Sequence, residues 1–179
     1  MKPAILMLRI ALSLLAAWPA AAVAQASTGP ARDALLDRLE GRWIATGMIV
    51  GKPVAHDVDA AWVLAHQYLL VHEVSREKNA QGGPQYEAFV YIGVNRAAAG
   101  EYTCLWLDST SGEGLVNGIS CHARLDAQRI PFVFRDKDGR VDFTNTFAYD
   151  RASDTWTWSL DNVRDGKPSP FARMKLQKE

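Results

Sequence analysis

Beyond residue 40 the chain is a succession of short runs with apolar residues at every second position, and a tight turn follows each run. A period of two is typical of β-strands that bury one face. About ten such runs occur, and no helical pattern of crossover length separates them. Parallel pairing needs such crossovers, so the strands are expected to pair antiparallel with their neighbours in the chain.

The predicted strands fill the chain from residue 42 to residue 176. They cover residues 42–50, 54–64, 68–76, 86–95, 101–109, 115–125, 130–135, 141–149, 155–163 and 170–176. Closure of a long row of strands removes the exposed sheet edges. The predicted fold is therefore all-β, a closed antiparallel up-and-down β-barrel of about ten strands. An open sandwich of two sheets is the alternative.

A short N-terminal helix is expected over residues 30–40, just before the first strand. Leu35, Leu36 and Leu39 fall on one helical face, and Gly41 suits the end of the helix. Trp43 follows at the head of the first strand, where it is expected to plug one end of the barrel. Small barrels either fill with side chains or hold one small ligand.

Residues 1–24 have the pattern of a secretory signal peptide. A basic start is followed by an apolar core and by the small-x-small sequence Ala22-Val23-Ala24. The apolar core is shorter than the roughly 20 residues of a spanning helix, so no integral membrane segment is expected after cleavage. Residues 25–34 form a flexible lead-in and the helix start, and residues 35–179 form one barrel domain. The protein is expected to be secreted or periplasmic.

Charge excludes some classes of partner. The first 24 residues hold two basic residues and no acidic one, so the remaining 155 residues carry 18 basic and 20 acidic residues, a net charge of −2. This balance predicts no binding of nucleic acid or anionic lipid.

The two cysteines are predicted to form a cross-strand disulfide. Gly112-Glu113 suits a two-residue hairpin turn, and the register that it sets places Cys104 opposite Cys121 and Asp108 opposite Asn117. The cysteines then form a non-hydrogen-bonded pair with Cα atoms near ~4.5 Å, within disulfide reach in an oxidising compartment. Two free buried thiols in a looser hairpin are the alternative.

No catalytic or metal-binding motif stands out. The four histidines show no zinc-type spacing, and Gly-x-Ser-x-Gly, Walker and dinucleotide-binding motifs are absent from the sequence. We therefore expect no metal, no cofactor and, on balance, no enzymatic activity.

Aromatic residues recur through the strands, and polar residues share faces with some of them. Core filling explains most of the aromatics, whereas an apolar cavity with a few polar groups would bind a small molecule. Asp108 and Asn117 also have a plainer explanation, which is that they satisfy each other across the hairpin. The candidates for lining such a pocket are Trp43, His72, Tyr91, Trp106, Asp108, Asn117 and Asn145.

The opening Leu39-Glu40-Gly41-Arg42-Trp43, with Gly47, resembles that of calycin-like barrels, which include lipocalins and fatty-acid-binding proteins. Residues 35–176 resemble a family of bacterial secreted proteins described as a lipocalin-like domain of unknown function, through this opening, Tyr91-Ile92-Gly93-Val94-Asn95 and Trp106-Leu107-Asp108-Ser109. The resemblance implies a closed antiparallel barrel and brings no established activity.

Two features depart from better-known barrels. Haem-binding barrels of the nitrobindin type also begin with Gly-x-Trp, but their iron-ligating histidine lies near the C-terminus, and no histidine follows His122 here. The lipocalin Thr-Asp-Tyr element is missing as well.

The leading functional hypothesis is non-covalent binding of a small apolar or amphipathic molecule. One alternative is a filled barrel that acts as an interaction module. Another is a pocket enzyme that uses His72 and Asp108 for acid–base chemistry, which would require both within hydrogen-bond reach of one substrate atom.

Overall fold

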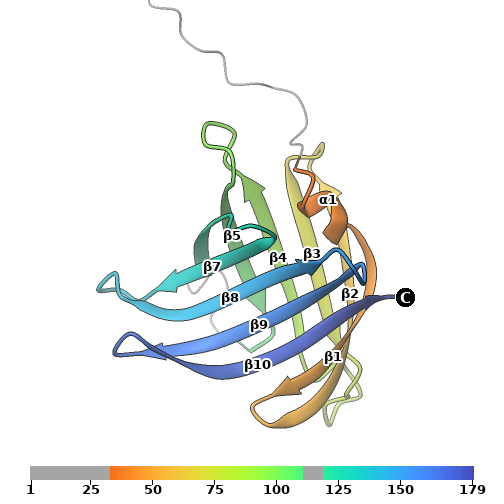
Figure 1. Cartoon of the computed structure of the whole chain (residues 1–179). Helices are drawn as coiled ribbons and strands as arrows, with labels where there is room; N and C mark the ends of the chain where they lie inside the picture. The colour runs from red at the N-terminus through yellow and green to blue at the C-terminus, as the bar shows by residue number, and fades with distance from the viewer. Residues whose placement is uncertain (1–32, 111–118) are drawn as a thin grey trace, which may run out of the picture.

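The computed structural model describes residues 33–110 and 119–179; the predicted signal peptide and the predicted turn at residues 111–114 lie outside these ranges. The described part holds one short helix, α1 (Leu36–Leu39), and ten strands (Figure 1). The strands are β1 Gly41–Ile49, β2 Lys52–Val63, β3 Tyr68–Ser75, β4 Glu87–Val94, β5 Glu101–Asp108, β6 Ile119–Arg124, β7 Arg129–Arg135, β8 Val141–Asp150, β9 Thr155–Arg164 and β10 Lys167–Lys178.

The strands form a closed antiparallel barrel in which each pairs with its neighbours in the chain, as predicted. β1 closes the barrel because it pairs on one side with β2 and on the other with β10. Gly47 lies in this closing seam, where a Cβ atom would come within 2.0 Å of the carbonyl oxygen of Arg173. Only glycine permits the two backbones to approach so closely.

Two turns are tighter than the sequence analysis expected. Val50-Gly51 and Asp165-Gly166 are two-residue connections in which both residues have positive φ, so β2 begins at Lys52 and β10 at Lys167. This is the pattern of type I′ hairpin turns, whose twist matches that of the flanking strands. Pro168 and Pro170 fit within β10 because the pairing of β10 with β1 starts only at Ala172.

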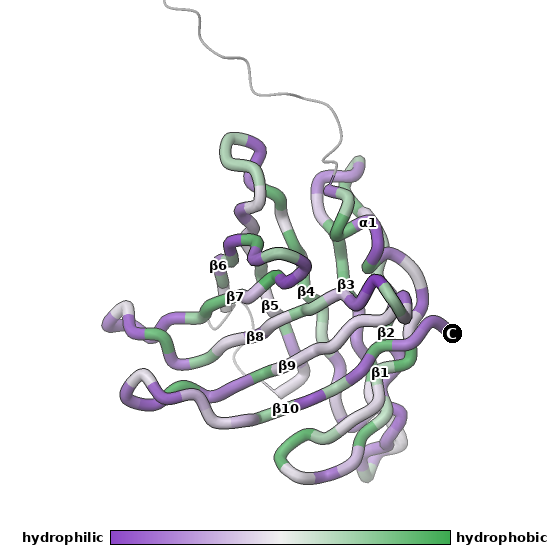
Figure 2. Tube along the Cα trace, in the orientation of Figure 1, coloured by the Kyte–Doolittle hydropathy of each residue, from purple (hydrophilic) through white to green (hydrophobic). Residues whose placement is uncertain are grey.

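Hydrophobic and hydrophilic residues alternate along the strands (Figure 2). The hydrophobic face points inward and forms one continuous core. Its largest completely buried side chains are Trp43, Trp156, Trp158, Tyr102, Phe132, Phe147, Leu36, Leu39, Leu69, Ile92, Ile130 and Leu176.

The helix is shorter than the 30–40 span predicted. Residues 34 and 35 form a turn, and α1 is a single helical turn whose Leu36 and Leu39 are completely buried. Short as it is, this turn lies at one end of the barrel (Figure 1). Leu39 accepts a hydrogen bond of 2.7 Å from Trp43 Nε1, and Asp37 accepts one of 2.9 Å from Trp62 Nε1. We call the end of the barrel at which α1 lies the helix end, and the opposite end the far end.

Asp33 fixes the turn to the barrel wall. Its Oδ1 accepts hydrogen bonds from the backbone N–H groups of Leu35 and Leu36, and its Oδ2 accepts one of 2.7 Å from the Tyr102 hydroxyl of β5. The carboxylate therefore caps the turn and satisfies a buried tyrosine at once.

The predicted disulfide is present between Cys104 of β5 and Cys121 of β6, with Cα atoms 4.9 Å apart. The described part of the hairpin also has the predicted register, since Trp106 faces Ile119. The pairing of Asp108 with Asn117 lies outside the described residues. No helix in residues 33–110 or 119–179 is long and apolar enough to cross a membrane.

Replacing both cysteines with alanine is expected to lower the free energy of unfolding by about 3 kcal/mol, because the bridge constrains a loop of this length in the unfolded chain. Chemical denaturation of the oxidised protein and the double variant measures the difference. The reduced wild type should unfold at the same denaturant concentration as the double variant. An oxidised wild type that also unfolds at that concentration would contradict the prediction.

Asp33→Ala should cost about 1–3 kcal/mol, since it removes the cap and leaves the Tyr102 hydroxyl unpaired in the core. Glu40→Ala, which removes an exposed carboxylate just after α1, is the matched control. Thermal and chemical denaturation of the two variants test this, and equal losses would show that Asp33 does not hold the turn.

Candidate functional site

The far half of the interior contains the polar groups that the core cannot explain. Four inward-facing polar side chains are almost completely buried there or midway along the barrel: His56, Glu73, Ser75 and Asn145. Burial of a polar group is costly unless it is hydrogen-bonded, so each of them requires a partner.

His56 of β2 and Glu73 of β3 form a buried pair. His56 Nδ1 lies 2.5 Å from Glu73 Oε1, and each side chain is only 3 % exposed. The strand register explains the contact: Val58 faces Glu73 and His56 faces Ser75, so His56 and Glu73 are diagonal neighbours on the inner face. Burial raises the pKa of Glu73 above its ordinary value of 4.5, and outweighs the opposing effect of the hydrogen bond with His56.

Tyr86 and Trp106 extend this pair across the interior. The Tyr86 ring stacks against His56 with centroids 6.1 Å apart, and the Tyr86 hydroxyl accepts a hydrogen bond of 3.3 Å from Trp106 Nε1. Burial is the main cause that raises the pKa of Tyr86, and the nearby charges of Glu73 and Asp108 act in the same direction. The phenol therefore stays protonated and can donate a hydrogen bond.

Asn145 of β8 lies at the other end of this series of contacts. We call His56, Glu73, Tyr86, Trp106, Trp158 and Asn145 the polar row. The Trp106 ring lies 6.0 Å from that of Trp158, whose Nε1 donates a hydrogen bond of 2.6 Å to Asn145 Oδ1. The side chain of Asn145 is completely buried, yet its Nδ2 has no partner among the described residues. The indole donor identifies which amide atom is the oxygen, so the unpartnered atom is an N–H₂ donor.

Four of the pocket candidates lie on the inner face. Trp43 is buried at the helix end, where its indole donates to the carbonyl oxygen of Leu39 in α1. Trp106 and Asn145 belong to the polar row. Asp108 is half-buried at the far end, where its Oδ1 accepts hydrogen bonds from the backbone N–H and the hydroxyl of Thr110. Asn117 lies outside the described residues.

The structure places His72 and Tyr91 on the outer face instead. In β3 the buried positions are Leu69, Val71, Glu73 and Ser75, so His72 points outward, where it pairs with Glu87 at 2.7 Å. Its ring stacks on Phe89 with centroids 4.3 Å apart. His72 borders a small outer groove of about 110 Å³ between β1, β2 and β3. The barrel wall therefore separates His72 from Asp108, and the two do not share one site.

Sequence reasoning missed His56, Glu73 and Tyr86. A signal for His56 was available, because it falls on the same face of its strand as Val58, Ala60 and Trp62. The inward carboxylate of Glu73 carried no such signal, since its hydrogen-bond partner among the described residues, His56, lies 17 residues away in the chain.

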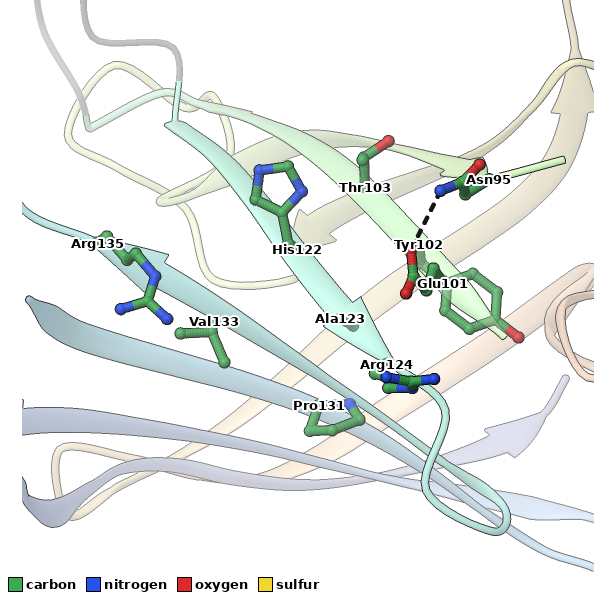
Figure 3. Close-up of a pocket in the computed structure, with 10 residues that line it drawn as sticks. All are labelled: Asn95, Glu101, Tyr102, Thr103, His122, Ala123, Arg124, Pro131, Val133 and Arg135. Carbon is green, nitrogen blue, oxygen red and sulfur yellow. Dashed lines mark hydrogen bonds between the residues drawn. The ribbon is translucent and has the colours of Figure 1, made fainter. Parts of the chain in front are cut away.

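A larger cleft lies in the barrel wall, away from the polar row. It has a volume of about 520 Å³ and is bordered by β5, β6 and β7 (Figure 3). Its lining residues are Asn95, Glu101, Tyr102, Thr103, His122, Ala123, Arg124, Pro131, Val133 and Arg135.

No group of three or more metal-ligating side chains occurs within the described ranges. No protein-family model matches the chain, and no curated protein matches it in sequence. The geometry of the described residues is therefore the basis for a functional proposal.

The His56–Glu73 pair predicts a pH-dependent stability. The pKa of Glu73 is raised in the folded state, so this carboxyl group contributes to the free energy of unfolding. That contribution is full below pH 4.5 and is lost as the pH rises through the raised value. Compared with Glu73→Gln, the wild type should therefore lose stability as the pH rises above 4.5.

Urea denaturation of both proteins between pH 4 and pH 8 gives the difference in unfolding free energy. The amide keeps an acceptor oxygen for His56 and does not titrate, so the comparison isolates the carboxyl group. A difference that grows in favour of the wild type from pH 4 to pH 6 would instead show an ionised pair.

Proposed function

We propose that the protein binds a small amphipathic molecule non-covalently in the far half of the barrel interior. The observation that carries the proposal is the completely buried amide donor of Asn145, which has no partner among the described residues. A buried unsatisfied donor costs about 1–3 kcal/mol, and a ligand oxygen that accepts its hydrogen bond would recover that cost.

The surroundings of Asn145 define the class of ligand. Trp158, the donor to Asn145, belongs to a buried aromatic cluster with Trp106 and Phe134, in which both neighbouring rings lie within 6.4 Å of the Trp106 centroid. The Tyr86 hydroxyl is a second donor, and the raised pKa of Glu73 limits negative charge in the interior. An aromatic or alicyclic molecule with an uncharged acceptor such as a carbonyl group fits this combination.

The compartment is part of the same proposal. Residues 1–24 would act as a signal peptide, and the mature protein would be secreted or periplasmic. The Cys104–Cys121 disulfide is consistent with an oxidising compartment. The closed barrel with Trp43 beneath α1 is consistent with a lipocalin-like carrier.

A second candidate function is acid–base catalysis in the same interior, and the His56–Glu73 contact favours it. A carboxyl group that orients a histidine is a common arrangement for a general base. This pair takes the place of His72 and Asp108, which lie on different faces of the barrel wall. Turnover that His56→Gln abolishes, without loss of binding, would favour the enzyme over the carrier.

A filled barrel that acts through its surface is the remaining alternative. Strand addition would need an open sheet edge, and the described sheet is closed. This alternative therefore relies on surface side chains instead of backbone pairing.

Native mass spectrometry of the protein purified from its own host tests the proposal directly. The expected result is an extra mass that is lost on denaturation and that belongs to a neutral carbonyl-containing compound. No extra mass, together with no response of tryptophan fluorescence to a panel of fatty acids and small metabolites, would favour the filled barrel.

A pair of variants then tests the role of Asn145. Trp158→Phe removes the indole that occupies Asn145 Oδ1 and is the matched background; Asn145→Leu in that background removes the amide without leaving an indole unpaired. Isothermal titration with the compound identified should show at least a tenfold weaker affinity in the double variant, as expected for one buried hydrogen bond. Equal affinities would contradict the proposed site.

A further inference from the structure

The cleft between β5, β6 and β7 lies over the weakest seam of the barrel. β6 and β7 pair at His122 and Val133, and again at the bridge between Asp126 and Arg129. The bridge has both of its backbone hydrogen bonds, at 3.0 and 2.8 Å. Between these two points the ladder is interrupted.

Pro131 is the cause of the interruption. In an antiparallel ladder, hydrogen-bonded pairs alternate with pairs that exchange no hydrogen bonds. Asp126–Arg129 is a hydrogen-bonded pair, so the next pair expected to exchange hydrogen bonds, two residues further along each strand, is Arg124 with Pro131. Proline has no N–H group and cannot donate to the Arg124 carbonyl. The cleft opens at this position, and Figure 3 shows Arg124 beside Pro131.

The cleft carries unpaired positive charge. The guanidinium group of Arg124 makes no ion pair or hydrogen bond with any residue in the described ranges, although the Arg124 backbone pairs with Glu101 in the β5–β6 ladder. Arg135 donates to the carbonyl oxygen of Gly139 but has no acidic partner there. His122 lies between them on β6 (Figure 3). Arginine guanidinium groups without an acidic partner are well suited to hold a carboxylate or phosphate.

Glu101 is the one acidic side chain among the lining residues described. It faces Arg124 in the β5–β6 register, yet its Oε2 accepts a hydrogen bond of 3.1 Å from Asn95 Nδ2 and it forms no ion pair with the arginine. The guanidinium group of Arg124 therefore stays available to a ligand.

The rest of the cleft is apolar. Pro131 and Val133 of β7 are half-buried on the outer face. Ala123 and Tyr102, which are buried and face inward, also border the cleft. A volume of about 520 Å³ lies within the range of about 300–1,000 Å³ typical of small-molecule sites.

We propose that this cleft is a second ligand site, separate from the interior, which binds a small organic anion. Arg124 holds the carboxylate or phosphate group with support from Arg135. The apolar part of the ligand lies on Pro131 and Val133, in the space that the interrupted ladder leaves open.

Isothermal titration with benzoate, phenyl phosphate and inorganic phosphate tests the proposal. Both aromatic anions should bind more tightly than inorganic phosphate, and the preference between them identifies the headgroup. Arg124→Gln should weaken aromatic-anion binding about tenfold or more, the effect expected of one charge-assisted contact. Glu101→Gln should tighten it.

Arg164→Gln is the control, because it removes the same charge from an exposed position at the end of β9. It should leave the affinity unchanged. Equal losses in Arg124→Gln and Arg164→Gln would reveal non-specific attraction, and no measurable binding to the wild type would also overturn the proposal.

Pro131→Val tests the role of the seam without changing any charge. The new N–H group should donate to the Arg124 carbonyl, become protected from hydrogen exchange and narrow the cleft, so that benzoate binds more weakly. A protected amide with unchanged affinity would contradict the assignment of the site to the Pro131 interruption.

Discussion

Pairing of β1 with both β2 and β10 is the constraint on which the rest of the structure depends. It converts a meander of hairpins into a closed wall and so creates an interior that side chains must fill. Gly47 makes this closure possible, because any Cβ atom at that position would meet the β10 backbone. Once the wall is closed, one end needs a cover, and the single helical turn supplies it through Leu36 and Leu39.

Much of this architecture could be predicted from the sequence. Alternation of apolar residues located the ten strands, because a strand with one buried face repeats every two residues. Turn chemistry placed Cys104 opposite Cys121, since a two-residue loop fixes the register of its hairpin. The largest differences at described strand ends are the starts of β2 at Lys52 and of β10 at Lys167, which lie before the predicted residues 54 and 170 because Val50-Gly51 and Asp165-Gly166 are turns of only two residues.

The candidate site was harder to predict, and β3 shows why. One of its faces carries Leu70, His72 and Val74, whereas the other carries Val71, Glu73 and Ser75. Both faces mix apolar and polar groups, so alternation alone does not say which is buried. The Glu73 carboxyl group can face inward because it forms a hydrogen bond with His56, and that contact depends on the register between β2 and β3. A sequence pattern within one strand does not contain this information.

The wall and the interior depart from a fully satisfied barrel in two independent places. Pro131 removes one donor from the β6–β7 ladder, and Asn145 places a donor in the core without an acceptor in the described part. A chain selected for stability alone would gain from a residue with an N–H group at the first position, and from an apolar residue at the second together with phenylalanine in place of Trp158, whose indole would otherwise lose its acceptor. The chain has neither change. Pro131 borders a cleft and Asn145 lies beside an aromatic cluster, so both positions are where we look for ligands. The two sites also differ in charge: a buried carboxyl group with a raised pKa and a phenol line the first, and arginines without a described acidic partner line the second. They therefore select different molecules, a neutral acceptor inside the barrel and an anion in its wall.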